Sequence, residues 1–299
     1  MAQVDIRRGT TGVPLTPDIS NEIWAGVLET SAVMQAAGTI TLPGKGLSIP
    51  MITAEPTANW VLETEEKPVS RGAVSSKNMT PYTIAVIVPF SNQFKRDVSG
   101  LYSELVARIP AALARKFDRT VYGVDAVPGT GFDTLGAAPA LTVDATGTFG
   151  DVLAVLGAVS AAGFDVSDWI VNQELYSLLL TAVDPQGRQF FTVNQAPSGQ
   201  LAQQILGSNV IKTRTPFKSS TSAADDTGIV GDWKNAARVG IVEGVQVSVS
   251  DTATINDGGT QLNLWQRNMF ALRAEIEVGF IYRDINAFVR VQNPTVDTP

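Results

Sequence analysis

The chain has 299 residues, of which 44% are hydrophobic, a formal net charge of -7, and neither histidine nor cysteine. Without these two residue types it has no disulfide, no zinc site built on thiolates or imidazoles and no Ser-His-Asp triad. Its negative net charge disfavours direct binding to nucleic-acid phosphates. The first 20 residues lack the apolar core of a secretion signal and the longest apolar-rich stretch, 152–164, is too short to span a membrane, so we expect a globular protein that is neither secreted nor inserted in a membrane.

The N-terminal segment is expected to form an arm followed by one short helix. Residues 1–19 contain glycines and prolines and show no apolar periodicity. Ser20 or Asp18 can cap a helix that runs to about Gln35. A strand-like segment then covers residues 40–52, interrupted by a turn at Pro43-Gly44-Lys45-Gly46.

Residues 58–90 are expected to form a long hairpin. Its two β-prone arms are Trp60–Glu65 and Tyr82–Phe90, joined by a polar stretch that predicts a tip in solvent. The second arm has the period-two alternation of a strand, and Pro89 restricts it to the edge or the end of a sheet. Because a two-stranded hairpin has too little core to be stable alone, we expect it to rest on another surface.

The clearest helical periodicity lies in residues 98–126, where apolar side chains recur three or four residues apart. Pro110 predicts a kink in this helix, because it removes an amide donor and its ring meets the carbonyl group of Val106. The glycine-rich segment Pro128–Pro139 lacks the Gly-Lys-Ser/Thr sequence of a phosphate-binding loop, so we interpret it as a linker.

The remaining sequence predicts helices in the middle of the chain and strands at both ends, an α+β arrangement. A strand is expected at 168–171, with helices at 149–162, 172–183 and 201–206. Further strands are expected at 229–231, 237–243, 245–250, 262–277 and 288–291. The tryptophans interpreted as core or interface anchors are Trp60, Trp169, Trp233 and Trp265.

An active site in this chain would have to use carboxylates, Ser-Lys pairs or a hard metal ion. The densest acidic cluster is Glu63, Glu65 and Glu66, which lies beside Lys67 and Arg71 on the expected hairpin. Such a cluster most often forms a solvated surface with salt bridges, and acid-base or metal chemistry is the alternative. We therefore expect no enzyme, no metal and no cofactor, with a carboxylate-dependent hydrolase as a rival hypothesis.

A second charged feature lies on the expected strand at 262–277. Arg273 and Glu275 alternate there with apolar residues, which is typical of a half-exposed antiparallel strand, and a charged face this regular can also mark a contact between subunits. These two residues, together with the five charged residues of the hairpin, are our candidates for such contacts.

Four stretches of the chain stand in a characteristic order and spacing. The first stretch is Leu47-Ser48-Ile49-Pro50 followed by Trp60-Val61 and Glu63, the second is Phe117–Gly123, and the third is Trp169-Ile170-Val171-Asn172 followed by Leu178, Leu179, Asp184, Gly187 and Arg188. The fourth and most specific comprises Gly231-Asp232-Trp233, Ala237–Val245, Asn268–Glu275, Val278-Gly279 and Asn286–Val289. In the order and spacing of these four stretches, the chain resembles the major capsid protein family of tailed bacteriophages.

The resemblance implies an α+β Hong Kong 97-like capsid fold. It assigns an N-terminal arm and short helix to 1–39, a strand leading into the P-domain to 40–57, the E-loop hairpin to 58–90, the P-domain with its spine helix to 91–143, the A-domain to 144–262 and C-terminal P-domain strands to 263–299. The function it implies is a major capsid protein whose hexamers and pentamers form an icosahedral shell around DNA. The protein would then belong to the virion, after assembly in the host cytoplasm.

The resemblance also implies partners. The capsid-like pattern starts by residue 20 and leaves no room for a scaffolding segment, so we expect a separate scaffolding protein, or a processed or truncated chain. A portal and decoration proteins are further expected partners, and DNA would be enclosed without sequence-specific binding. Some members of the family crosslink an E-loop lysine to an asparagine; Lys67, Lys77 and Asn286 are eligible by position, but no partner aligns and we expect no crosslink. An encapsulin-like protein compartment of the same fold is the nearest rival.

Overall fold

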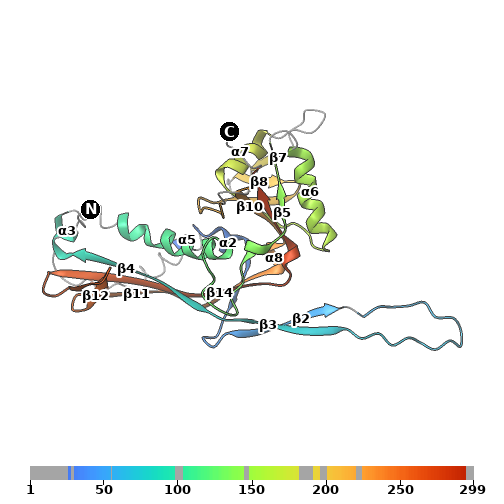
Figure 1. Ribbon diagram of the computed structural model, residues 1–299, viewed down its shortest axis with the longest axis horizontal. Coiled ribbons are helices and arrows are strands. Elements are labelled where there is room, and N and C mark those ends of the chain that lie inside the picture. Colours follow the sequence, from blue (N-terminus) through green and yellow to red (C-terminus); the bar gives the residue numbers. More distant parts are fainter. Residues whose placement is uncertain are drawn as a thin grey trace.

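The computed structural model describes residues 26–27, 30–54, 56–97, 104–144, 148–181, 191–195, 201–219 and 224–293. Figure 1 shows three parts: a long four-stranded sheet with a helix along one face, a seven-stranded sheet with two helices that stands on it, and a two-stranded hairpin that projects to one side. The predicted α+β class is confirmed. The expected N-terminal arm and the capsid-like residues Asp184, Gly187 and Arg188 lie outside the described residues.

The four-stranded sheet has the order β1 (Gly38–Thr41), β11 (Ala237–Ser250), β14 (Met269–Tyr282) and β4 (Tyr82–Ser91). β1 is parallel to β11, and the other neighbours are antiparallel. Buried apolar residues alternate with more exposed charged residues in the middle of β14, so one face packs against a helix and the other is charged. The predicted alternation is confirmed, and Pro89 lies in an edge strand as expected.

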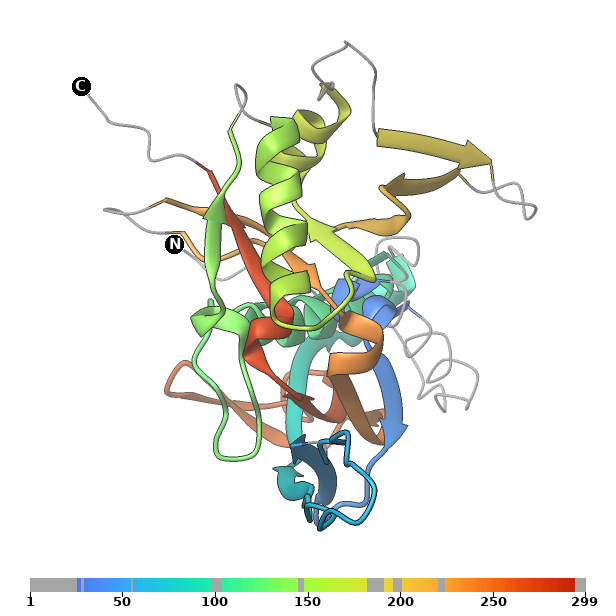
Figure 2. The same ribbon diagram turned by 90° about the vertical axis from the view of Figure 1, so that its right-hand side faces the viewer.

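The seven-stranded sheet has two strands at its centre that are buried along their whole length, β6 (Asp168–Val171) and β10 (Asp226–Gly231). Helices α6 (Thr148–Ala161) and α7 (Gln173–Thr181) contact strands of this sheet, and Figure 2 shows α6 in front of it. The full order is β5 (Ala140–Thr142), β15 (Phe288–Gln292), β10, β6, β9 (Ser208–Lys212), β8 (Leu201–Ile205) and β7 (Phe191–Gln195).

One core joins the two sheets. Ile170 and Ile229 of the seven-stranded sheet belong to the same apolar cluster as Phe117 of helix α5 (Ile109–Val121) and Phe280 of β14. A separate cluster around Trp169 lies between the seven-stranded sheet and its helices. Because burying apolar surface is the main stabilising term in folding, the two sheets are held together by the shared core.

The hairpin consists of β2 (Leu47–Ala54) and β3 (Ala73–Met79), and residues 56–72 form the hairpin tip. The predicted pairing is therefore wrong: Trp60–Glu65 forms no strand, and Tyr82–Phe90 pairs with β14. The physical reason is that β3, with the sequence AVSSKNM, has almost no apolar face and gave no strand signal, whereas β4 has an apolar face that a helix covers. The turn expected at Pro43-Gly44-Lys45-Gly46 is confirmed.

The long helix predicted at 98–126 is described from residue 104 and ends earlier than predicted, at Val121. Residues 104–107 are helical, Arg108 is in a turn, and α5 runs from Ile109 to Val121 with Pro110 in its first turn. The helical run is thus interrupted at Arg108, close to the predicted kink, although the Arg108 backbone stays in the αR region. Pro110 then lies in the first turn of α5, where its missing N–H would be unpaired anyway. The helix ends before Gly123, which has a positive φ of 77° and lies against the backbone of Gly136.

Several short elements complete the fold. The helix predicted at 201–206 is wrong, since β8 pairs there with β7 and β9. The helix predicted to end at about Gln35 is described only from residue 26, and its last part is α2. The short elements are α2 (Ala32–Ala36), α3 (Asn92–Asp97), η1 (Leu135–Ala137), α8 (Trp233–Ala236), β12 (Thr254–Asp257), β13 (Thr260–Asn263) and η2 (Ile285–Ala287).

Candidate assembly surface

The hairpin tip is a loop with its own internal hydrogen bonds. The N–H of Thr57 donates to the hydroxyl of Ser70 at 2.7 Å, which ties the two sides of the loop together. Farther out, the N–H of Leu62 donates to the carboxylate of Glu65 at 3.1 Å. Thr64, in the same turn, has a φ of 72°. A β-branched residue in the left-handed region is strained, so this turn is held in a conformation that the residue type does not favour.

The tip gathers the five charged residues that the sequence predicted for it. All five side chains are exposed, and within the described part of the chain none of them makes an ion pair: Glu63, Glu65, Glu66, Lys67 and Arg71. Their charges are thus available to a partner.

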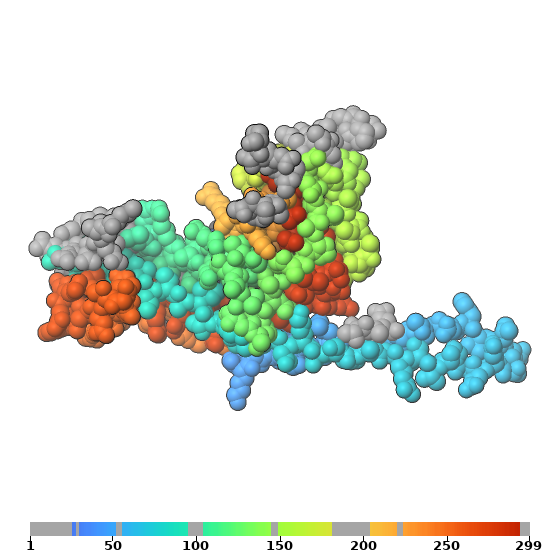
Figure 3. Space-filling view, in the orientation of Figure 1, coloured from blue at the N-terminus to red at the C-terminus, as the bar shows by residue number. Residues whose placement is uncertain are grey.

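The tip also exposes large apolar side chains, which sequence reasoning missed when it expected a solvated loop. Trp60 is fully exposed (104%), Leu62 and Val69 are exposed by 80% or more, and Val74, next to the tip in β3, is exposed by 72%. Figure 3 shows that the hairpin stands clear of the body of the protein over most of its length. Apolar side chains gathered on a projecting loop mark an interaction site. The sequence does contain a signal for this surface, namely apolar residues placed between charged ones.

The base of the hairpin is fixed to the body. The ammonium group of Lys77 forms an ion pair with Asp133 and donates to the carbonyl oxygen of Tyr282 at 2.9 Å. The same carboxylate accepts the N–H of Tyr282 at 3.1 Å. Beneath this pair, Met79 is buried with Leu42 and Ile281. These contacts set the direction in which the hairpin leaves the body, and they occupy Lys77.

Arg273 and Glu275 lie on a different surface. They face away from α5 on β14, where their side chains form an ion pair at 3.2 Å. The Nε of Arg273 also donates to Ser248 of the neighbouring strand. In Figure 1 the hairpin tip and the first half of β14 lie on opposite sides of the molecule. The structure therefore does not bring these two residues together with the charged residues of the hairpin tip.

A buried carboxylate that the sequence analysis did not single out joins α5 to α2. Asp118 is fully buried and accepts hydrogen bonds from the hydroxyl of Ser31 at 2.6 Å and from the N–H of Ala32 at 3.0 Å. Burial raises the pKa of Asp118 from 3.8 to about 7, although these hydrogen bonds act to lower it. Tyr122, one turn further along α5, is also buried, and burial together with the charge of Asp118 raises its pKa well above 10.

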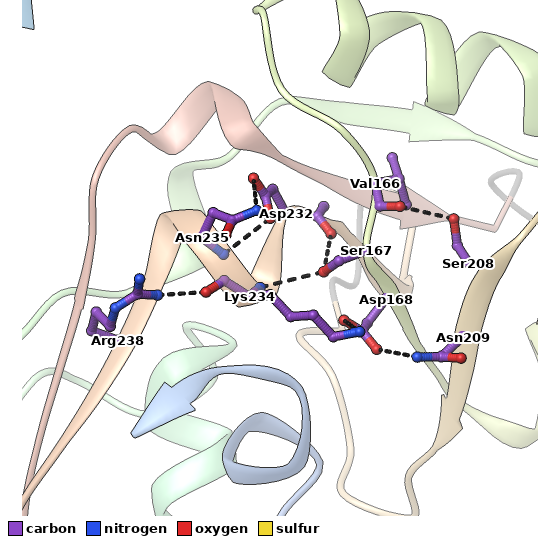
Figure 4. Close-up of polar contacts among 10 residues, drawn as sticks. Val166, Ser167, Asp168, Ser208, Asn209, Asp232, Lys234, Asn235 and Arg238 are labelled. Atoms are coloured by element: carbon purple, nitrogen blue, oxygen red, sulfur yellow. Dashed lines mark hydrogen bonds and ion pairs between the residues drawn. The ribbon is translucent and has the colours of Figure 1, made fainter. Parts of the chain in front are cut away.

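A polar cluster holds the junction between the two sheets (Figure 4). Asp168, at the start of β6, accepts a hydrogen bond from Asn209, and its second oxygen lies 3.9 Å from the ammonium group of Lys234 in α8. The N–H of Lys234 in turn donates to the hydroxyl of Ser167, and Arg238 donates to the carbonyl oxygen of Lys234. These contacts link β6 to the short helix through which the chain passes from one sheet to the other.

The residues that the structure describes contain no group of three or more acidic, histidine or cysteine side chains that could hold a metal ion. None of the described helices is both long enough and apolar enough to cross a membrane.

Comparison with known proteins identifies the family of this chain. The model of the phage capsid family matches residues 11–293. The chain belongs to the phage capsid family. It is thus a structural capsid protein and a component of the virion, in a family of shell proteins and not of enzymes. Self-association is what such a shell requires.

Individual relatives agree with this result. The chain is 27% identical over 290 residues to the probable major capsid protein gp17 of Mycobacterium phage D29, which covers 93% of this chain and 90% of the relative. It is 22% identical over 289 residues to the major capsid protein of Staphylococcus phage 80alpha, which covers 93% and 84%.

Solved structures confirm the predicted capsid fold. A chain from Gordonia phage Cozz has a TM-score of 0.69 and 24% identity, with 89% of this chain and 87% of that chain covered. A chain from Mycobacterium phage Adephagia has a TM-score of 0.70 and 21% identity, with 90% and 92% covered. A capsid chain of an empty GTA particle has a TM-score of 0.60 and 15% identity, with 98% and 96% covered.

Proposed function

We propose that this phage capsid protein is the major capsid protein of a tailed phage and that it assembles into hexamers and pentamers of an icosahedral shell around DNA. The observation that carries the proposal is the hairpin tip, which exposes Trp60 and Leu62 on a loop that stands clear of the body. Burial of one such side chain is worth about 1.5–3 kcal/mol. A second copy of the chain can supply the surface that covers them.

The placement of the hairpin supports rings. It leaves the body on one side, and the long sheet with α5 extends on the other (Figure 1). If the hairpin of each copy contacts the body of the next, the contact is head-to-tail, and a head-to-tail contact closes into a ring when its rotation allows. A hexamer and a pentamer of one chain are two rings of this kind.

The parts of the capsid fold can then be assigned on this chain. The hairpin from β2 to β3 is the E-loop, which replaces the range 58–90 with residues 47–79. The four-stranded sheet with α5 is the P-domain and its spine helix, and the seven-stranded sheet with α6 and α7 is the A-domain, which meets its neighbours at the centre of the capsomer. Assembly takes place in the host cytoplasm, with a separate scaffolding protein, a portal and decoration proteins as partners.

The seven charged candidates then have roles in contacts between subunits. Those of the hairpin tip, exposed and without ion pairs among the described residues, bind opposite charges on the neighbouring subunit. Arg273 and Glu275 form part of a partly exposed, charged face of β14 where another subunit or a decoration protein binds.

Negative-stain electron microscopy of the purified protein, with and without a coexpressed scaffolding protein, tests the proposal. Large hollow icosahedra or capsomer rings are the expected result. Small shells filled with other proteins would favour an encapsulin-like compartment instead. Dispersed monomers under all conditions would refute assembly, and the hydrolase hypothesis would then be tested by replacing Glu63, Glu65 and Glu66 with Gln, which should abolish turnover if they are catalytic.

A further inference from the structure

Helix α2 lies at the joint between the two large sheets. It contacts α5, which packs on the four-stranded sheet, and it also contacts β6 and β9 of the seven-stranded sheet. Four of its five residues are buried. A helix of five residues is too short to be stable by itself in water. α2 therefore keeps its place only through its contacts with these neighbours.

Asp118 of α5 holds the first turn of α2. Its carboxyl group accepts hydrogen bonds from the hydroxyl of Ser31, which caps α2, and from the N–H of Ala32, the first residue of the helix. The same hydroxyl accepts the N–H of Met34. Both contacts persist when Asp118 is protonated, because a neutral carboxyl group still has an oxygen that accepts, and its O–H can donate to the hydroxyl of Ser31. The neutral form thus fastens α2 to α5.

The immediate surroundings of Asp118 offer nothing that balances a negative charge. The side chain is fully buried, and α2, with the sequence AVMQA, has no ionisable group. The titratable group that faces Asp118 is the phenol of Tyr122, which is buried one turn further along α5 and carries no positive charge. Since a buried carboxylate without a cation beside it is costly, the ionised form of Asp118 is the unfavourable one.

The charged residues of the elements around Asp118 are engaged elsewhere. On the α5 side, Lys116 and Arg119 both pair with Asp125. On the seven-stranded sheet, Asp168 belongs to the polar cluster of Figure 4, and the ammonium group of Lys212 lies 4.3 Å from the centre of an aromatic ring. The charged face of β14 points away from α5. Within the described part of the chain, no cation therefore serves Asp118 as a counter-ion.

We propose that Asp118 is a proton-operated latch: its neutral carboxyl group holds α2 in the joint between the two sheets, and loss of the proton lets α2 leave the joint so that the carboxylate reaches water. The latch lies within a single subunit and does not depend on the assembly proposed above. Because α2 precedes every described strand in the chain, the latch decides whether the start of the chain is fastened to α5.

The latch operates near neutral pH. Burial raises the pKa of Asp118 from 3.8 to about 7 in the closed form, whereas in the open form water restores the ordinary value. The closed form is therefore favoured at low pH, and this preference is lost as the pH rises toward 7. Each pH unit between the two values raises the equilibrium constant for opening about tenfold, so a rise from pH 5 to pH 7 raises it about 100-fold.

Amide hydrogen exchange of full-length, unassembled subunits between pH 5 and pH 8, corrected for the intrinsic exchange rate, tests the latch. The amides of Gln35 and Ala37, which donate to the carbonyl groups of Ser31 and Val33, report the opening of α2, and the amides of β14 report global unfolding. The opening constant of α2 should exceed that of β14, depend less on urea, and rise about 100-fold between pH 5 and pH 7. Equal constants with equal urea dependence would overturn the inference, because α2 would then leave only when the whole subunit unfolds.

Three variants identify the group that titrates. In Asp118→Asn the opening constant of α2 should be independent of pH, and a slope like that of wild type would refute the role of Asp118. Asp125→Asn is the matched control and should keep the wild-type slope, because Asp125, with a pKa of about 2, is ionised throughout this range. Ser31→Ala removes the cap and should raise the opening constant at every pH with the slope unchanged. The loss of that slope would also contradict the latch, so the test stands even if Asp118→Asn does not fold.

Discussion

Replacing Asp118 with Asn removes an ionisable group from the core between α5 and α2. The carboxyl group is fully buried, and burial raises its pKa from 3.8 to about 7. The shift is about three units, and each unit corresponds to about 1.4 kcal/mol, so ionised Asp118 lowers the free energy of unfolding by about 4 kcal/mol. Asn has nearly the same shape and no charge, and it can still accept a hydrogen bond from Ser31 or from the N–H of Ala32.

The pH dependence follows from the sign of the shift. Between pH 3.8 and about 7 the folded state binds the proton of Asp118 more tightly than the unfolded state does. The contribution of Asp118 to the free energy of unfolding therefore falls as the pH rises through this window and is constant above it. Of the three pKa units of this shift, about two lie above pH 5. The free energy of unfolding of the Asp118→Asn variant, relative to wild type, should therefore rise by about 3 kcal/mol between pH 5 and pH 8.

Urea unfolding of unassembled subunits at several pH values measures this difference. Asp125→Asn is the matched control. In the wild type, the hydrogen bond that Arg119 donates to Asp125 lowers the pKa of this carboxyl group from 3.8 to about 2. The stabilisation from Asp125 is complete above pH 3.8 and is lost only as the pH falls toward 2, so this variant should run parallel to wild type between pH 5 and pH 8. If the Asp118→Asn profile is also parallel to wild type, the buried carboxylate does not titrate as argued.

Three further predictions concern the hairpin. Glu63→Lys should reduce the yield of particles, measured by sedimentation, and leave the melting temperature of the subunit nearly unchanged; normal particles at normal yield would contradict a role in assembly. Trp60→Ala should likewise change subunit stability by less than about 0.5 kcal/mol, because the side chain is fully exposed, yet impair assembly more than Trp265→Ala does. Asp133→Asn should cost about 1 kcal/mol because it breaks the ion pair with Lys77, and should speed amide hydrogen exchange in β3; unchanged exchange would show that the buried Met79 fixes the hairpin by itself.

The elements that could be predicted from sequence are those with one apolar face or a fully apolar run. β14 alternates apolar and charged residues, and β6 is apolar nearly throughout because it is buried on both faces. In α5, Leu113, Phe117 and Val121 recur at helical spacing and are all buried. In each case one local pattern determined both the type of element and the surface that it buries.

The hairpin could not be predicted in the same way. β3 pairs with β2 across the hairpin tip, and most of its side chains are exposed, so no apolar pattern marks it as a strand. β4 has a strong strand pattern, which by itself predicts an arm of the hairpin, although its apolar face belongs to the core beneath α5. Periodicity detects burial within one chain, and it is weak where a strand is built to lie outside the core.

The candidate residues likewise fall into those that a local sequence pattern indicates and those that it does not. The charges of the hairpin tip could be predicted as a group because they are adjacent in sequence. The ion pair of Lys77 with Asp133 joins residues 56 positions apart (133 minus 77), and nothing in the sequence links them. Asp118 had a signal that could have been used, because it stands four residues after Ala114 and three before Val121, on the buried face of the helix.

The two kinds of surface in this subunit carry separable tasks. The apolar cluster shared by the two sheets includes no residue of the hairpin tip, whose Trp60, Leu62 and Val69 side chains are exposed. Substitutions at the tip can therefore change how copies associate while leaving the fold of each copy intact, and substitutions at Asp118 or Trp233 should do the reverse. In the shell that we propose, one chain fits both five-fold and six-fold rings and gains from this separation, since the contact can adjust without repacking the core.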